Sequence, residues 1–535
     1  MIPVTESFFM KANILLGLVL VSGANAFAQS TNHMGVEELR QVRLPDVVLD
    51  SVTPVAPDRQ KNPGAAAYLQ VKGAIGGTIR FELLLPEAWN GRFVMGGGGG
   101  FVGTVQNMAR GTVDKGYATV GTDTGHEYEP GYLAPWALDN VEAQLNFGYL
   151  AVHRTAEVAK ALIRAYYRTD ATHCYFLGCS RGGGQAMMEA QRYPNDFDGI
   201  VAGAPAFNWT GFAATMVSIA KALYPDPNHL GSTVLTKDAL VKLQQSILEQ
   251  CDAQDGLKDG VIQDPASVRF DLSKVPGLTD AERKAIDAIY QGARNGKGPI
   301  CVGYPQGAEC DPDQWIAWLV GPIPPMVAKD HVPDLTFAFG TQVFKYLVFN
   351  QPDWDYSKYD FSNFENDTRL AASFLNATNP DLDAFKAHKG KLIIWHGWSD
   401  QAIPPAGTLD YYQRLWQHSG GLRETQEWAR VFMIPTMAHC FGGYRLTEFD
   451  PLPALVSWVE RGTPPDRIIA TARDPQGHVL RSRPVFPYPV QAKYNGTGSI
   501  DDASNFVPAA PLLAPHDTIR WVGTDLYTKL GPVAP

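Results

Sequence analysis

Short apolar runs and longer helical segments alternate along two separate stretches of this chain of 535 residues. Residues 142–167 repeat apolar side chains at the spacing of one helix face, and a second helical pattern runs from Arg181 to just before Pro194. Six apolar runs are typical of buried strands: 92–95, 117–120, 174–177, 200–203, 391–397 and 430–434. Because alternating strands and helices form a mostly parallel sheet covered on both faces, the sequence predicts an α/β fold.

The segment 206–384 interrupts this pattern. It is rich in Trp, Pro, Asp and Gly, and it contains helical stretches at 237–250 and 280–290 but no clear succession of strands. The simplest interpretation is one α/β domain, formed by residues 29–205 and 385–535, that carries a large inserted domain.

The first 28 residues are predicted to be a signal peptide. Lys11 precedes an apolar run at 14–21, and small residues at 24–28 fit an A-x-A cleavage site. The run is too short to span a bilayer, and a buried N-terminal helix is the alternative. The formal charge of −10 argues against nucleic acid or an anionic membrane as a partner. We therefore expect a secreted or periplasmic protein, in which the six cysteines can form disulfides.

Residues 178–182 read Gly-Cys-Ser-Arg-Gly and match the pattern G-x-S-x-G. The motif follows an apolar strand and begins a helix, which is the context of a nucleophile elbow. Glycines allow the close backbone approach at such a turn and leave the hydroxyl of Ser180 exposed. The alternative is a glycine-rich turn whose serine only caps the helix.

A serine nucleophile needs a base, and the base needs an acid that orients it. Asp400 follows the predicted strand 391–397, and His439 follows the strand 430–434, which is the chain order of this type of site. Ser180, Asp400 and His439 are therefore the predicted catalytic residues. The other histidines are assigned structural roles, with His396 and His126 as the most misleading candidates.

Two cysteines flank the predicted nucleophile and base. Cys179 immediately precedes Ser180, and Cys440 immediately follows His439. A disulfide holds two Cα atoms about 5.5 Å apart, so a Cys179–Cys440 bridge would bring the two catalytic residues within reach.

The negative oxygen of a tetrahedral intermediate needs hydrogen-bond donors. The backbone N–H of Arg181 is one candidate, and the five-glycine run 96–100 offers a second, at Gly98 or Gly99. The alternative for this run is a phosphate-binding loop, but it lacks the G-K-[ST] ending of that motif.

Three carboxylates, Asp252, Asp255 and Asp259, lie within eight residues of the inserted segment. Calcium takes oxygen ligands from such loops, so the loop is a candidate metal site, although a solvated Asp/Gly turn is equally compatible with the sequence.

The sequence resembles the family of tannases and feruloyl esterases, which includes mono(2-hydroxyethyl) terephthalate hydrolases. Four motifs carry the resemblance: residues 178–180, 122–126, 396–400 and 439–443. The resemblance implies an α/β-hydrolase fold in which 206–384 is a lid domain with a structural calcium. The implied ligands are the carboxylates of Asp252, Asp255 and Asp259 and the carbonyls of Leu257 and Val261. Beside this pattern, Cys301 and Cys310 bracket a short segment and are expected to pair, and Cys174 is expected to be a free buried thiol.

The predicted function is a secreted serine carboxylic ester hydrolase that acts through an acyl-enzyme on a small aromatic or phenolic ester. A serine peptidase of the same fold, a catalytically silent binding protein and a calcium-dependent adhesion module are the alternatives. Aromatic residues crowd the segment 311–360, and most are expected to form the core of the lid. Phe344 and Tyr346 are predicted to stack on the acyl group, and Lys345 is predicted to bind the far end of that group.

Overall fold

A nine-stranded mixed sheet forms the centre of the computed structural model, which describes residues 33–307, 309, 311–511 and 521–523. The predicted signal peptide and Cys310 lie outside these residues. From one edge to the other, the strands are β1 (Val47–Val55), β2 (Tyr68–Ile75), β3 (Ile79–Pro86), β5 (Ala118–Thr122), β4 (Arg92–Gly96), β6 (His173–Cys179), β7 (Gly199–Gly203), β10 (Lys391–Gly397) and β11 (Ala429–Ile434).

The sheet is parallel from β5 to β11 and antiparallel from β1 to β5. All six strands predicted from sequence belong to the parallel part. The antiparallel strands β1, β2 and β3 were missed, although Gly76 and Gly77 between β2 and β3 are a hairpin signal.

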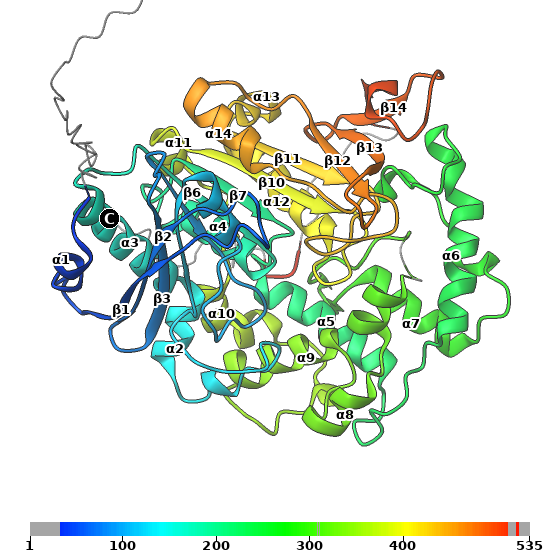
Figure 1. Cartoon of the computed structure of the whole chain (residues 1–535). Coiled ribbons are helices and arrows are strands. Elements are labelled where there is room, and N and C mark those ends of the chain that lie inside the picture. Colours follow the sequence, from blue (N-terminus) through cyan, green and yellow to red (C-terminus); the bar gives the residue numbers. More distant parts are fainter. Residues whose placement is uncertain (1–32, 308, 310, 512–520, 524–535) are drawn as a thin grey trace, which may run out of the picture.

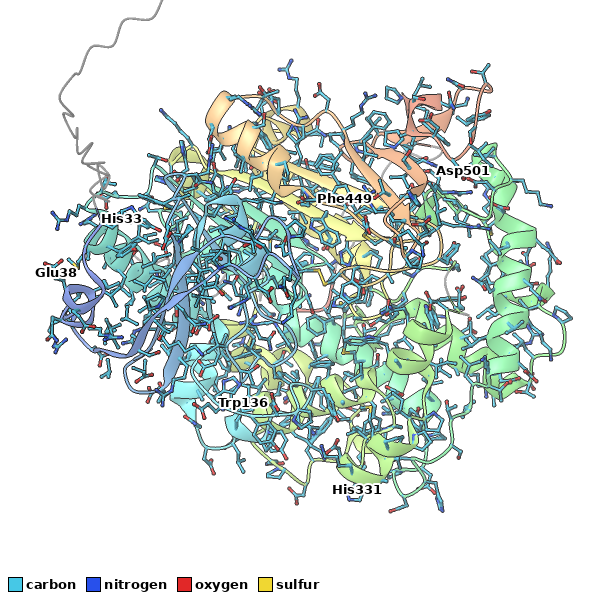
Figure 2. All side chains as sticks on the ribbon, viewed as in Figure 1. His33, Glu38, Trp136, His331, Phe449 and Asp501 are labelled. Carbon is cyan, nitrogen blue, oxygen red and sulfur yellow. A yellow bond between two sulfur atoms is a disulfide. The ribbon has the colours of Figure 1, made fainter. Side chains whose placement is uncertain are left out.

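Both faces of the parallel strands are buried, which explains their nearly continuous apolar runs. In β10, Leu392 and Ile394 face one core, whereas Ile393 and Trp395 face the other. Phe449, labelled in Figure 2, packs against Trp395 on this second face.

Helices cover both faces of the sheet (Figure 1). Apolar residues of α3, α4 and α12 belong to the first core, and those of α14 belong to the second. The helices outside the insertion are α1 (Val36–Arg40), α2 (Val141–Leu145), α3 (Ala151–Tyr167), α4 (Arg181–Arg192), α11 (Asp383–Ala387), α12 (Pro405–His418), α13 (Leu422–Gln426) and α14 (Leu452–Arg461).

No described residue between β7 and β10 contributes a strand to the sheet. This segment is helical, and its apolar side chains form a large core together with residues of the α/β domain such as Phe101 and Phe147. Figure 1 shows its green helices below and to one side of the sheet. Side-chain caps begin several of these helices; α7 starts with a capping box between Thr279 and Glu282. The helices are α5 (Trp209–Leu223), α6 (Lys237–Cys251), α7 (Asp280–Gln291), α8 (Pro324–Asp330), α9 (Leu335–Gln342) and α10 (Phe364–Leu375).

Three small two-stranded sheets complete the fold: β8 (Arg294–Asn295) with β9 (Gly298–Pro299), β12 (Ile468–Arg473) with β13 (Val479–Val485), and β14 (Gln491–Tyr494) with β15 (Phe506–Ala509). Within the described residues, every helix is too short or too polar to cross a membrane.

Candidate active site

Ser180 occupies a strained turn between β6 and α4. Its φ of +62° lies in the left-handed region that side chains rarely adopt, and α4 begins at the next residue. The turn is held from both sides, because Ser180 N–H donates to the Gly203 carbonyl (3.0 Å) and its own carbonyl accepts from Ala206 N–H (2.9 Å). The serine side chain is half-buried and faces a cavity. This geometry is that of a nucleophile elbow and not of an ordinary helix cap.

Glycines are required around this turn. A Cβ on Gly178 would lie 2.3 Å from the Gly182 carbonyl oxygen, and one on Gly97 would lie 2.6 Å from the Gly182 Cα. The G-x-S-x-G spacing and the glycine run after β4 therefore reflect the same crowded crossing of three backbone segments.

Asp400 and His439 meet at the carboxyl ends of β10 and β11. His439 Nδ1 lies 2.7 Å from Asp400 Oδ2, and Asp400 Oδ1 accepts the N–H groups of Ala402 (2.7 Å) and Ile403 (2.8 Å). Burial alone would raise the pKa of Asp400, but the facing rings of His439 and His396 hold it well below its usual range. The carboxylate is therefore ionised and fixes the orientation of His439.

The other ring nitrogen of His439 is available. Nε2 is buried and has no hydrogen-bond partner among the residues that the structure describes, and the ring lines the same cavity as Ser180. A base needs this arrangement, with one nitrogen held by the acid and the other free to take a proton from the nucleophile.

His396 is a contact of the acid that the sequence analysis set aside as structural. This ring is fully buried, and its Nε2 lies 3.0 Å from Asp400 Oδ2 while its Nδ1 lies 2.8 Å from Thr408 Oγ1. The spacing of four residues between His396 and Asp400, across the end of one strand, was the available signal. His126, the other set-aside candidate, stacks on Trp136 with ring centroids 3.6 Å apart and lies outside this cluster; Figure 2 labels Trp136.

The Cys179–Cys440 disulfide is confirmed. Its Cα atoms are 5.8 Å apart, and it closes a sequence separation of 261 residues directly beside Ser180 and His439. The bridge joins the elbow to the loop that carries the histidine.

The predicted oxyanion donors are only partly available. Arg181 is the first residue of α4, so its N–H has no partner within the helix, and the residue lines the cavity. The N–H groups of Gly98 and Gly99 instead donate to the side-chain oxygens of Gln185 (3.1 Å) and Gln106 (2.8 Å), which corrects the assignment of these two glycines. The sequence did not show that nearby glutamines use both amides.

Gly100 is the other residue of the glycine run whose backbone N–H could donate to an oxyanion beside Ser180. It lines the cavity, and its N–H makes no hydrogen bond with any residue that the structure describes.

The cavity in front of Ser180 has a volume of about 450 Å³ and is walled mainly by apolar side chains. This is the size of a site for a small organic ligand. Four of its aromatic residues belong to the inserted segment: Trp209, Phe212, Trp318 and Phe339. Trp318 stacks on Phe339, with centroids 5.6 Å apart, and its edge contacts the ring of His439, also at 5.6 Å.

Comparison with known proteins decides the family. The family model described as tannase and feruloyl esterase matches residues 68–509, which is most of the chain. The chain belongs to the tannase and feruloyl esterase family. An uncharacterized esterase from Xanthomonas campestris is 32% identical over 88% of this chain and 90% of its own length. The mono(2-hydroxyethyl) terephthalate hydrolase of Piscinibacter sakaiensis is 30% identical over 81% of this chain and 82% of its own length.

Solved structures agree with this membership of the tannase and feruloyl esterase family. The crystal structure of feruloyl esterase B from Aspergillus oryzae superposes with a TM-score of 0.75 at 26% identity, covering 89% of this chain and 100% of that one. The family resemblance and the α/β-hydrolase fold predicted from sequence are both confirmed.

Three residues predicted to contact the substrate do not line the cavity of this family member. Phe344 is fully buried and stacks on Trp354 (5.2 Å), inside the core of the insertion, while Lys345 and Tyr346 are half-buried elsewhere. The helix α9 continues into a π-helical turn, Val343–Val348, which changes the direction of these side chains from that of a regular helix. Trp318 and Phe339, which also belong to the insertion, line the cavity instead.

The free cysteines correct a second expectation. Cys301 is a buried free thiol that hydrogen-bonds with Thr215, so it does not form the expected bridge to Cys310, which lies outside the described residues. The side chain of Cys301 packs in the apolar core that contains the insertion. Cys174 is a free thiol as expected, although it is half-buried, and Cys251 is free and buried.

The acidic loop follows α6 directly. Asp252 accepts Gly260 N–H (3.0 Å), and Asp255 accepts the N–H groups of Leu257 (3.0 Å) and Gln263 (3.3 Å). Burial and the neighbouring charges of Asp259 and Asp252 raise the pKa of Asp255 to about 6. Three acidic side chains thus share one turn of chain, where a cation would stabilise them.

Two arginines of β13 reach the same loop. Asp259 Oδ2 lies 2.8 Å from Arg483 and 3.3 Å from Arg481. Among the described residues, the groups of three whose ligand atoms lie within 4.8 Å of one another are His153–Glu189–Asp196 and Asp381–Asp383–His418, and the loop is not one of them. The oxygen donors of the loop suit calcium in kind, but these side chains would have to draw together to hold it.

Proposed function

We propose that this chain hydrolyses carboxylic esters with an aromatic acyl group, through an acyl-enzyme on Ser180. The observation that carries this proposal is the imidazole of His439, which Asp400 holds at Nδ1 and which has no partner at Nε2 within the described part of the chain. It shares one cavity with a serine on a strained elbow. Membership of an esterase family supports it.

In the proposed reaction, Ser180 Oγ attacks the ester carbonyl carbon while His439 Nε2 takes the hydroxyl proton. The negative oxygen receives the N–H groups of Arg181 and Gly100. The intermediate then collapses, and the alcohol leaves with the proton from His439. Water attacks the acyl-enzyme with His439 again as base, which frees the acid and returns the proton to Ser180 Oγ. Asp400 stays ionised throughout.

The walls of the cavity favour a flat and uncharged acyl group. Trp318, Phe339 and Trp209 offer aromatic faces, and the polar side chains are neutral ones such as Gln314 and Gln401. Arg181 and His439 are the only ionisable bases among the described residues that line the cavity, and the guanidinium of Arg181 is buried. A carboxylate on the far end of the substrate would therefore find no free cation.

A panel of purified substrates tests the proposal. We expect hydrolysis of methyl ferulate and methyl gallate, weaker hydrolysis of mono(2-hydroxyethyl) terephthalate, and none of a matched aromatic amide or peptide. A protein that cleaves the peptide faster than the esters would instead be a peptidase, and one that cleaves nothing would contradict the proposal.

We also propose that the acidic loop holds a structural calcium ion. Asp252, Asp255 and Asp259 would supply carboxylate oxygens, and Leu257 and Val261 would supply carbonyls. Among the three carboxylates, Asp259 is the one that pairs with described arginines. The ion would neutralise the charge of the other two. The support is the charge of the loop, and elemental analysis of the purified protein tests it.

Export to an oxidising compartment is a further part of the proposal. The Cys179–Cys440 bridge supports it, because disulfides persist outside the reducing cytosol. The N-terminal sequence of the protein recovered from a periplasmic or culture fraction tests the predicted cleavage after residue 28.

A further inference from the structure

Three side chains that can bind a metal ion meet between α3 and α4. His153 lies on α3, Glu189 lies near the end of α4, and Asp196 lies in the turn that follows α4. One possible ligand atom from each lies within 4.8 Å of those from the other two. Glu189 stands eight residues after the first residue of α4, about 12 Å along the helix axis, so this group is separate from the candidate active site at Ser180.

Glu189 has a buried carboxylate that no donor satisfies. The residue is 1% exposed, and neither carboxylate oxygen has a hydrogen-bond partner among the residues that the structure describes. Burial and the neighbouring charge of Asp196 raise the pKa of Glu189 well above its usual range. Two ionised carboxylates cannot hydrogen-bond with each other, so either a proton or a cation has to lie between Glu189 and Asp196.

The ring of His153 is held in place beside this pair. Its Nδ1 lies 2.7 Å from Asp196 Oδ2, and the ring stacks on Tyr193 with centroids 3.8 Å apart and an angle of 2° between the planes. Tyr193 N–H donates to the Glu189 carbonyl (2.9 Å), and Asp196 N–H donates to the Tyr193 carbonyl (3.0 Å). The same short stretch of backbone therefore positions both carboxylates and the ring that packs on it.

The charges around the group leave an excess of two negative charges when His153 is neutral, as a metal ligand has to be. Lys160 Nζ lies 3.2 Å from Glu157 and 3.5 Å from Asp196, and Glu189 adds a third carboxylate to this one ammonium. Spacings of four and seven residues place Glu157 and Lys160 on the same face of α3 as His153. One shared proton would remove one of the two excess charges, whereas a divalent cation would remove both.

We propose that His153, Glu189 and Asp196 bind one divalent transition-metal ion, for which zinc is the best match, and that this ion joins α3 to the end of α4. An imidazole nitrogen and two carboxylate oxygens are zinc ligands, and water completes the tetrahedron. Bonds of about 2.0–2.1 Å would place the ligand atoms about 3.4 Å apart, so each side chain would move by less than about 1 Å. The ion displaces the proton that lies between His153 and Asp196, and this proton passes to solvent.

Titration with zinc tests this site. The full chain is purified without a histidine tag and freed of metal with a chelator that is then removed, and calcium is kept in the buffer so that zinc does not enter the acidic loop. We expect calorimetry to show one zinc ion per chain, and the melting temperature to rise by a few degrees with zinc at about 100 times its Kd. Glu189→Gln, which keeps the size of the side chain, should weaken binding by about 100-fold or more, beyond the loss of an orienting partner.

A second group in the same chain is a matched control. Asp381, Asp383 and His418 also bring their ligand atoms within 4.8 Å of one another, but all three residues are exposed, and His418 already lies 3.4 Å from both carboxylates. Water solvates these side chains, so Asp383→Asn should leave the affinity for zinc unchanged. Zinc affinity that falls in Asp383→Asn and not in Glu189→Gln would place the ion at the exposed group, and the proposal would be wrong.

A proton shared by Glu189 and Asp196 is the competing explanation. In that case zinc would not change the melting temperature of the natural protein, and Glu189→Gln, whose amide donates as a protonated carboxyl does, would be as stable as the natural protein with zinc. This result would overturn the proposal.

His153→Gln gives the same test if Glu189→Gln does not fold. The His153 side chain is 30% exposed, so its replacement removes the nitrogen ligand without opening the core. Zinc binding as tight in His153→Gln as in the natural protein would also overturn the proposal. Calorimetry and melting need no substrate, so a protein that cleaves no ester would contradict the proposed function and not this metal site.

Discussion

The carboxyl edge of the sheet and the acidic loop of the insertion both bury carboxylates, but they balance them differently. Asp400 contacts two histidines and two backbone N–H groups, and the pKa of this carboxyl stays below its usual range. Asp255 lies beside Asp252 and Asp259 with backbone N–H groups alone, and its pKa is raised to about 6. A buried carboxylate is stable where fixed groups match its charge; elsewhere it needs a proton or a metal ion.

The two regions should differ in whether a substitution changes the rate of turnover or the stability of the fold. The edge of the sheet is complete without a metal ion, so changes there should affect turnover more than folding. The acidic loop gives Asp255 no fixed counter-charge, so changes there should affect folding more than turnover.

The largest effect is expected from Ser180→Ala. Loss of the nucleophile should lower kcat by about 10⁴-fold or more, while the melting temperature stays close to that of the natural protein because the substitution opens no large cavity. Initial rates on methyl ferulate and a thermal melt measure the two quantities. A variant that retained a tenth of the activity would rule out Ser180 as the nucleophile.

Removal of the Cys179–Cys440 bridge should give the next largest effect. The bridge closes a loop of 261 residues, for which the chain-entropy model gives up to roughly 5 kcal/mol of stability. Because the bridge also sets the nucleophile against the base, small misplacements cost rate steeply, and we expect about 100-fold loss of kcat in Cys179→Ala with Cys440→Ala. Cys301→Ala, which removes a buried free thiol, is the control. Peptide mapping that found Cys179 and Cys440 as free thiols would contradict the bridge itself.

The aromatic wall should distinguish between substrates. Trp318→Ala and Phe339→Ala should lower kcat/KM for an aromatic ester about tenfold more than for an aliphatic one, a difference of ~1.4 kcal/mol. Phe344→Ala is the matched control, because Phe344 lies in the core of the insertion and should cost stability without changing that ratio. Equal losses on both esters for all three variants would make the insertion a scaffold only.

Chelation should have the smallest effect on rate and a clear effect on stability. A calcium ion bound only by the folded state stabilises it, so excess chelator should lower the melting temperature by several degrees. The raised pKa of Asp255 adds a signature in pH. Its folded pKa of about 6 exceeds the usual 3.8, so the metal-free protein should lose stability as the pH rises through this window.

Calcium should abolish this loss, and Asp255→Asn should remove it from the metal-free protein. Equal melting temperatures with and without chelator, together with the absence of calcium by elemental analysis, would exclude the metal site.

The sequence predicted most of what depends on local order along the chain. The six parallel strands, the elbow at Ser180 and the positions of Asp400 and His439 follow from apolar runs that end in loops, because the carboxyl ends of parallel strands meet at one edge. The flanking positions of Cys179 and Cys440 predicted the bridge for the same reason. The contact between His396 and Asp400 was missed because a spacing of four residues across the end of a strand does not by itself show that the two side chains turn toward each other.

What the sequence determined by itself was the type of fold, the family and the candidate catalytic residues. The tertiary structure alone decided which side chains surround them. Whether the amides of Gly98 and Gly99 are free depends on Gln185 and Gln106, and whether Phe344 or Trp318 faces the cavity depends on π-helical turns and on packing between distant segments. Such contacts are set by the closest fit of the whole core, and no short stretch of sequence contains that information.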